Sequence, residues 1–229
     1  MLQATESLPD VPRVPAPWSL RGHAWMVAMR LPSGDPARTA FVAPGLQATV
    51  KAAFSVLMCV VYEEAPCGPY RELLFIPGAF PFEDGRRHFT ISRIVVSTWD
   101  SVVNGRNNWG IPKDRADFTV ERAAGGRGQV VRVSSEGREL CELRFGSVRF
   151  APPLPVFGGL LPAALRTLAQ RFRDRTYYYV PEARGVVRPG RLLAWRFDPT
   201  LFPDLAGAAV LATFEVPSFR LVFPRADVR

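Results

Sequence analysis

The chain has 229 residues, of which 48% are hydrophobic, 11% aromatic and 22% charged. These proportions exclude a disordered or collagen-like chain and are sufficient for a sizeable hydrophobic core. The net charge is +8, but the basic residues are spread along the sequence without a nucleic-acid-binding motif, so we expect no nucleic-acid partner.

The predicted elements begin after a proline-rich stretch, residues 1–17, which we expect to form an extended N-terminal arm. Residues 18–229 then make a single domain, because no linker divides them. Asp35 and Pro36 predict a short helix over residues 37–42, since aspartate caps helices and proline suits the first turn. Strands separated by glycine and proline turns are predicted over residues 24–31, 50–62, 70–76, 87–98, 116–122, 129–134, 139–150, 177–180, 191–197 and 210–222.

One longer amphipathic helix is predicted over residues 160–175. Its apolar residues are Leu161, Leu165, Leu168 and Phe172. They recur at steps of four, three and four, so they form one face opposite the arginines. With few helices and many strands at short spacing, the chain is predicted to be mainly β. We expect the antiparallel strands to close into a barrel, because closure removes exposed edges.

The sequence predicts neither a metal site nor a membrane span. Three cysteines and two histidines show no metal-ligand spacing, and free thiols are expected. The longest apolar run, residues 52–62, is too short to cross a bilayer, and residues 1–13 hold no apolar leader segment. We therefore expect a cytoplasmic protein without membrane insertion.

Lysine is scarce, with only Lys51 and Lys113 among the 29 basic residues. Arginine cannot lose its proton near neutrality or form a Schiff base, whereas lysine does both. A lysine retained in such a chain is therefore a candidate for chemistry that arginine cannot perform. The alternative for Lys113 is a surface lysine in a loop after proline.

The segment around Lys113 is the most distinctive in the sequence. Residues 105–113 read GRNNWGIPK and resemble the active-site segment of the acetoacetate decarboxylase family, G-R-E-x-x-x-x-P-K-K. Upstream, Tyr70-Arg71-Glu72 resembles the family's Y-x-E, and residues 35–46 resemble its short helix with a proline-containing segment. The resemblance covers residues 18 to 120.

The resemblance implies a cone-like barrel with a central cavity, a homo-oligomer and no cofactor. It makes Lys113 the imine-forming residue and Glu72 a proton shuttle. Imine formation needs a neutral amine, and free lysine, with a pKa of ~10.4, is almost wholly ammonium at neutral pH. The family's lysine is activated by desolvation or a nearby cation. We expect four further residues to contact the substrate: Arg21, Arg106, Asn107 and Trp109.

Two departures from the family pattern bear on the reaction. Asp114 replaces the second lysine, so an anion stands where the family has a cation. If the segment is extended, Asp114 faces away from Lys113 and desolvation still activates the amine. Asn107 replaces the glutamate of G-R-E and cannot act as an acid or base. These changes argue against authentic acetoacetate decarboxylation.

Two functions therefore stand side by side. The first is a Schiff-base lyase of decarboxylase, aldolase or dehydratase type, which acts on a keto acid or another carbonyl compound. The second is a non-catalytic protein that holds an apolar, lipid- or carotenoid-like ligand in the barrel, because the lost carboxylate makes the cavity more apolar. Members of the family without the lysine pair share an opening similar to Pro15-Ala16-Pro17-Trp18.

Overall fold

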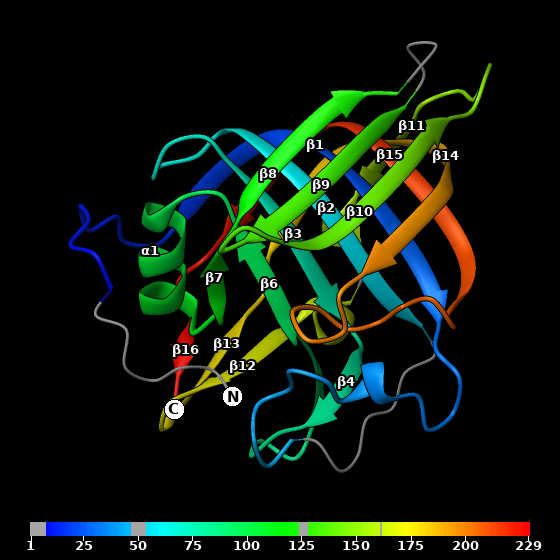
Figure 1. Ribbon diagram of the computed structural model, residues 1–229. Coiled ribbons are helices and arrows are strands. Elements are labelled where there is room, and N and C mark those ends of the chain that lie inside the picture. Colours follow the sequence, from blue (N-terminus) through cyan, green and yellow to red (C-terminus); the bar gives the residue numbers. More distant parts are fainter. Residues whose placement is uncertain (1–7, 47–53, 124–127, 161) are drawn as a thin grey trace.

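The computed structural model describes residues 8–46, 54–123, 128–160 and 162–229, which form a mainly β fold (Figure 1). The helices are η1 (Pro36–Arg38), α1 (Trp99–Trp109), η2 (Gly158–Leu160) and α2 (Ala163–Arg166). The strands are β1 (Trp18–Arg30), β2 (Ser55–Glu64), β3 (Tyr70–Ile76), β4 (Gly78–Pro81), β5 (Arg87–Thr90), β6 (Arg93–Val96), β7 (Lys113–Arg115), β8 (Asp117–Arg122), β9 (Gln129–Ser135), β10 (Arg138–Ser147), β11 (Leu154–Phe157), β12 (Leu168–Phe172), β13 (Arg175–Tyr179), β14 (Glu182–Phe197), β15 (Ala209–Phe223) and β16 (Asp227–Val228).

A large sheet curls until it nearly closes into a barrel (Figure 1). Its strand order is β7-β6-β3-β2-β1-β15-β14-β10-β9-β8, with β11 paired to β14 at the side. The strands at the two ends of this order, β7 and β8, are separated in the chain by Ala116 alone, whose N–H donates to the Val96 carbonyl at 2.9 Å. The chain itself therefore joins the two ends, and the predicted mainly β barrel is confirmed.

A second sheet of five strands, in the order β16-β13-β12-β5-β4, packs below the barrel. It shares no strand with the large sheet. The strand predicted over residues 87–98 is divided between the two sheets, because β5 belongs to the small sheet and β6 to the large one. The break falls at Ile91 and Ser92.

Side chains inside the barrel form two apolar clusters. One cluster lies around Trp25, Phe75, Leu143 and Phe202. The other contains Trp18 and other residues that line a cavity. The first cluster thus packs the interior of the barrel, and the second lines the space for a site.

The described part of the N-terminal arm, residues 8–17, forms neither helix nor strand and runs along α1 (Figure 1). Two asparagines of α1 hold it. The Asn104 amide accepts from Val14 N at 2.7 Å and donates to Pro12 O at 3.0 Å, and Asn108 Nδ2 donates to Val14 O at 2.8 Å. The same carbonyl accepts from Trp18 Nε1 at 3.1 Å, which connects the arm to the start of β1.

The helix predicted over residues 160–175 is wrong. Within the described residues of this stretch, one turn of α-helix, α2, is followed by the hairpin of β12 and β13. Leu168 lies opposite Tyr179 and also pairs in parallel with Phe89 of β5. Pairing with strands on both sides outweighs a helical spacing of only four apolar residues, of which Leu161 lies outside the described residues.

The main helix, α1, is instead at residues where none is predicted. Thr98 caps its start, accepting from Ser101 N at 3.4 Å, and Gly110 ends it with a left-handed backbone, φ 61°. The three asparagines and Gly105 lower its intrinsic helix propensity, which explains why the segment does not appear helical in the sequence.

The other predicted strands are confirmed with shifted ends, whereas the helix predicted over residues 37–42 is reduced to η1. The short helix after Asp35 is one 3-10 turn, capped by the Asp35 carboxylate, which accepts from Ala37 N at 2.9 Å. The strand predicted over residues 50–62 begins at Ser55, and residues 50–53 lie outside the described residues. Among the described helices, none has the length and apolarity that a bilayer crossing requires.

Candidate active site

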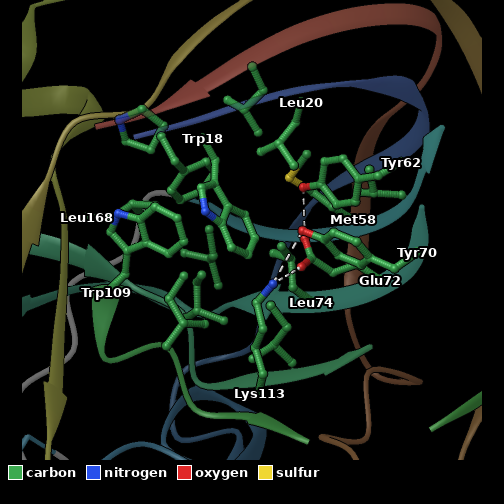
Figure 2. A pocket seen from close by; sticks show the side chains of 18 residues that line it. Trp18, Leu20, Met58, Tyr62, Tyr70, Glu72, Leu74, Trp109, Lys113 and Leu168 are labelled. Carbon is green, nitrogen blue, oxygen red and sulfur yellow. Dashed lines mark hydrogen bonds and ion pairs between the residues drawn. The ribbon is translucent and has the colours of Figure 1, made fainter. Parts of the chain in front are cut away.

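A cavity of about 160 Å³ lies between the large sheet, α1 and the start of the small sheet (Figure 2). Eighteen residues line it, and all but four are aliphatic residues, tryptophans, one methionine, one proline or one phenylalanine. The four with polar groups toward the cavity are Tyr62, Tyr70, Glu72 and Lys113. A small polar cluster in an apolar cavity is typical of a binding or catalytic site.

Lys113 is the first residue of β7, a three-residue strand that pairs in parallel with β6. Its side chain is 5% exposed. The Nζ atom donates to Glu72 Oε2 at 2.9 Å, to Ser101 Oγ at 3.0 Å and to the Tyr70 hydroxyl at 3.5 Å, and it lies 4.9 Å from the centre of the Tyr70 ring. The amine is therefore held among one anion, two hydroxyls and one aromatic face, away from bulk water.

Glu72 stands on β3, and its side chain is 4% exposed. Oε2 bonds to Lys113, whereas Oε1 accepts from the Tyr62 hydroxyl at 3.0 Å. Figure 2 shows Lys113 and Tyr62 meeting at this carboxylate. Both carboxylate oxygens thus have a partner, as a buried anion requires.

The two tyrosines come from adjacent strands, with Tyr62 on β2 directly opposite Tyr70 on β3. Burial, followed by the charge of Glu72, raises the pKa of both phenols well above its usual value. Neither phenol therefore ionises near neutral pH. Tyr62 remains a hydrogen-bond donor that holds Glu72 in place.

Helix α1 approaches Lys113 at Gly105. A Cβ atom at this position would lie 2.7 Å from Lys113 Cδ and 2.9 Å from Cε, closer than carbon atoms can pack. The absence of a side chain at Gly105 therefore provides the space for the lysine stem. Gly105, the first residue of the GRNNWGIPK segment, thus makes room for Lys113, the last residue of that segment.

Asp114 faces away from the cavity, as the extended segment predicts. Its carboxylate forms an ion pair with Arg93 and accepts from Arg106 Nη2 at 2.8 Å. Arg106 Nε also donates to the Lys113 carbonyl at 2.8 Å. Arg93 on β6 and Arg106 on α1 thus pair with Asp114 and hold β7 between these two elements, and this anion makes no contact with the Lys113 amine.

Of the residues expected to contact a substrate, Trp109 lines the cavity. Its Nε1 donates to Pro224 O at 2.6 Å, and its ring lies edge-on to Trp18 at 5.0 Å. The structure does not bring Arg21, Arg106 or Asn107 to the cavity. Leu20 points inward from β1, so its neighbour Arg21 points outward, where its side chain is 57% exposed beside Glu64. Asn107 is exposed on α1, and Arg106 lies behind Lys113.

Sequence reasoning assigned no role to Tyr62, Tyr70, Ser101 or Gly105. The sequence is sufficient to place Tyr70 at the site, because it precedes Glu72 by two residues on a predicted strand and so shares its face. Gly105 opens the recognised segment. Tyr62 reaches Glu72 only through the strand pairing, and Ser101 reaches Lys113 only through the unpredicted helix.

Among the described residues, no three histidine, cysteine, aspartate or glutamate side chains come together as a metal site. The reactive groups of the cavity are an amine and a carboxylate within proton-transfer distance, backed by two phenols and a hydroxyl. Such an arrangement can attack a carbonyl carbon and move the protons that the attack requires.

Comparison with known proteins agrees with the resemblance seen in the sequence. The sequence profile described as Acetoacetate decarboxylase (ADC) matches residues 15–200. A search of curated proteins found no match.

Several solved structures share the fold at low sequence identity. An acetoacetate decarboxylase-like enzyme from Sphingomonas wittichii RW1 has a TM-score of 0.66 at 16% identity, covering 100% of this chain and 98% of that chain. The enduracididine biosynthesis enzyme MppR, complexed with pyruvate, has a TM-score of 0.63 at 20% identity, covering 94% and 91%. Acetoacetate decarboxylase from Legionella pneumophila has a TM-score of 0.59 at 11% identity, covering 100% and 93%.

Proposed function

Because this chain belongs to the acetoacetate decarboxylase family, we propose that Lys113 forms a Schiff base with a small substrate, either a keto acid or another carbonyl compound. The observation that carries this proposal is the buried pair of Lys113 and Glu72, with its atoms 2.9 Å apart at the wall of an apolar cavity. The pyruvate complex of MppR supports a carbonyl compound as the ligand class.

Glu72 handles the protons of this reaction. Transfer of one proton along the bond from Lys113 Nζ leaves a neutral amine and a carboxylic acid. The nitrogen lone pair then attacks the carbonyl carbon, and the proton from Glu72 and one from nitrogen leave with the carbonyl oxygen as water. The product is a protonated imine beside the Glu72 carboxylate, with atoms and charge balanced.

The protonated imine accepts the electron pair of a bond that breaks next to it, which is the basis of lyase chemistry. Tyr62 fixes the carboxylate through Oε1, so that Oε2 stays directed at the nitrogen. Asp114 and Asn107, which replace a lysine and a glutamate of the family segment, lie outside the cavity lining. We do not propose authentic acetoacetate decarboxylation, since these family groups are missing.

A second candidate function is the storage or transport of an apolar ligand. It is favoured by the composition of the cavity wall, in which fourteen of eighteen residues carry no polar group or only a bonded indole N–H. In that case the ion pair of Lys113 and Glu72 is structural, and the cavity of about 160 Å³ holds a small apolar molecule or one end of a lipid- or carotenoid-like molecule.

Reductive trapping separates the two functions. The protein is mixed with small ketones, aldehydes and keto acids plus borohydride, and adducts are located by intact-mass analysis and peptide mapping. We expect an adduct on Lys113 and none on Lys51, the other lysine of the chain. The variant Lys113→Arg keeps the cation but cannot form an imine, so it should lose the adduct, whereas Lys51→Arg should keep it. Absence of any adduct on Lys113 would contradict the enzyme and favour the binding protein.

A further inference from the structure

The charges at the cavity wall cancel. Lys113 and Glu72 are the charged residues among the eighteen that line it, and they neutralise each other. The two arginines expected to bind the substrate are engaged elsewhere, with Arg106 on Asp114 and Arg21 beside Glu64 at the surface. Within the described residues, the cavity therefore offers no free cation to a second negative group.

A substrate carboxylate would be costly in this cavity. It would have to share the single cation with Glu72, which is already 2.9 Å from Lys113 Nζ. The remaining wall is apolar and cannot solvate a second anion. A neutral carbonyl compound carries no such cost, because forming its protonated imine preserves one cation beside one anion.

The size and shape of the cavity limit the rest of the substrate. Its volume of about 160 Å³ is close to that of an engineered apolar cavity of ~150 Å³ that holds one benzene molecule. Trp18 and Trp109 form an aromatic wall, and Leu20, Ile94 and Leu221 contribute aliphatic surface. An apolar group of about six carbons fits this space.

We propose that the substrate is a neutral ketone or aldehyde that carries an apolar group of about four to six carbons, and that a free keto acid is excluded. The proposal rests on the Schiff base at Lys113 and adds the substrate class. For such a substrate the first bond to break in the protonated imine is a Cα–H bond. Its proton passes to the Glu72 carboxylate, and its electron pair forms the carbon–carbon double bond of an enamine while the iminium nitrogen becomes neutral.

The test uses two pairs of compounds that differ only by a methyl group in place of a carboxylate. One pair is 2-hexanone and 2-oxohexanoate, and the other is phenylacetone and phenylpyruvate. Each is trapped on the wild-type protein with borohydride, and the rate at Lys113 is divided by the rate on free Nα-acetyl-lysine to remove the difference in intrinsic reactivity. We expect each ketone to react about tenfold faster than its acid after this correction.

The variant Glu72→Gln serves as a control on the cause. It removes the anion of the lining, so the preference for the ketone should shrink even if both rates fall. A second readout is the exchange of α-hydrogens of 2-hexanone in D₂O, followed by NMR, which we expect to depend on Lys113. Lys113→Arg should abolish this exchange.

The outcomes are distinguishable. Equal corrected rates, or faster trapping of the acids, would overturn the neutral substrate while leaving the Schiff base intact. Lack of an adduct with all four compounds would overturn both. Faster trapping of the ketones, with a smaller preference in Glu72→Gln, would support both.

Discussion

At the scale of single residues, Lys113 and Glu72 depend on each other because each is almost completely removed from water. An isolated buried charge loses its solvation without compensation, whereas a bonded pair recovers part of that loss. The same dependence does not hold for ion pairs at the surface, such as Arg21 and Glu64, whose side chains are more than half exposed.

We therefore predict strong coupling between Lys113→Met and Glu72→Gln in protein stability. Each single variant should lower the free energy of unfolding by about 3 kcal/mol, because it leaves one buried charge unpaired. The double variant should lose much less than the sum. Urea unfolding at pH 7 measures all three, and Arg21→Gln, which removes an exposed pair, should cost at most about 1 kcal/mol. Additive losses would contradict this prediction.

The sequence predicted the central pair of the site, Lys113 and Glu72. It did not predict their partners Tyr62 and Ser101, for a physical reason. Lys113 and Glu72 belong to segments that resemble the family, and Tyr70, two residues before Glu72 on the same strand, shares its face. Tyr62 and Ser101 lie 10 and 12 residues from the groups they contact, and only strand pairing or helix packing brings them there. Arg21 was misplaced because an uncertainty of one residue in a strand turns a side chain to the opposite face.

At the scale of elements, α1 controls the space available to the lysine. Its residue Gly105 lies against the Lys113 stem, and the helix is fixed from behind by the bonds between Arg106 and β7. Helix α1 and strand β7 therefore pack as one unit, and a small change in the side chains at their contact should shift the Lys113 amine.

We predict that Gly105→Ala destabilises the protein although alanine is the better helix former. An exposed helical position would gain about 1 kcal/mol from this change. Here the added methyl group overlaps the lysine stem, and overpacking should lower the free energy of unfolding by about 1–3 kcal/mol. Asn107→Ala, on the exposed face of the same helix, is the matched control and should not destabilise. Chemical denaturation of both variants checks this prediction, and a more stable Gly105→Ala protein would contradict it.

A second prediction at this scale concerns the N-terminal arm. Asn104 is buried and bonds to backbone atoms of Val14 and Pro12, so Asn104→Ala leaves a donor and an acceptor of the arm without partners. The lost bonds should cost about 1–3 kcal/mol and release the arm from α1. Trypsin should then cleave after the exposed Arg13 at least about fivefold faster than in the wild type. Unchanged cleavage would show that other contacts hold the arm, and Asn107→Ala again serves as the control.

Strands with one buried face were predicted well from the sequence. Elements whose structure depends on pairing with distant strands or on tertiary contacts were predicted poorly. The alternation in β9 and β10 made them visible in the sequence, with ends correct to within a few residues. The predicted helix over residues 160–175 failed because β12 gains its bonds from β13 and β5. Helix α1 was missed because tertiary contacts, including those of its asparagines with the arm, stabilise a segment of low helix propensity.

At the scale of the whole molecule, closure of the barrel follows from the short link between β7 and β8 and was predictable in kind but not in strand order. One strand remains outside this closure. β11 pairs only with β14 among the described strands, and all four of its residues are exposed. Phe150 and Leu160, on either side of it, are exposed as well.

We predict that the chain forms a homo-oligomer through this stretch. Exposed apolar residues on an unpaired strand edge favour pairing with a second copy. Leu154→Glu combined with Phe157→Glu should reduce the molar mass, measured by light scattering after gel filtration, to that of a monomer. Leu193→Glu changes a similarly exposed leucine elsewhere on β14 and should not. A wild-type monomer, or a double variant as large as the wild type, would contradict the prediction.

The cancelled charge at the cavity wall has a consequence for ionic strength. The chain carries +8 overall, and its arginines attract dissolved anions from the outside, an attraction that salt screens over ~10 Å at 0.1 M. Because 2-hexanone is uncharged and the cavity presents no net charge, its capture at Lys113 should proceed at the same rate from about 0.02 M to about 0.5 M sodium chloride. Rates that fall steeply with salt would contradict this. The salt dependence of the rate therefore distinguishes attraction of anions to the charged surface from capture of a neutral molecule in the cavity.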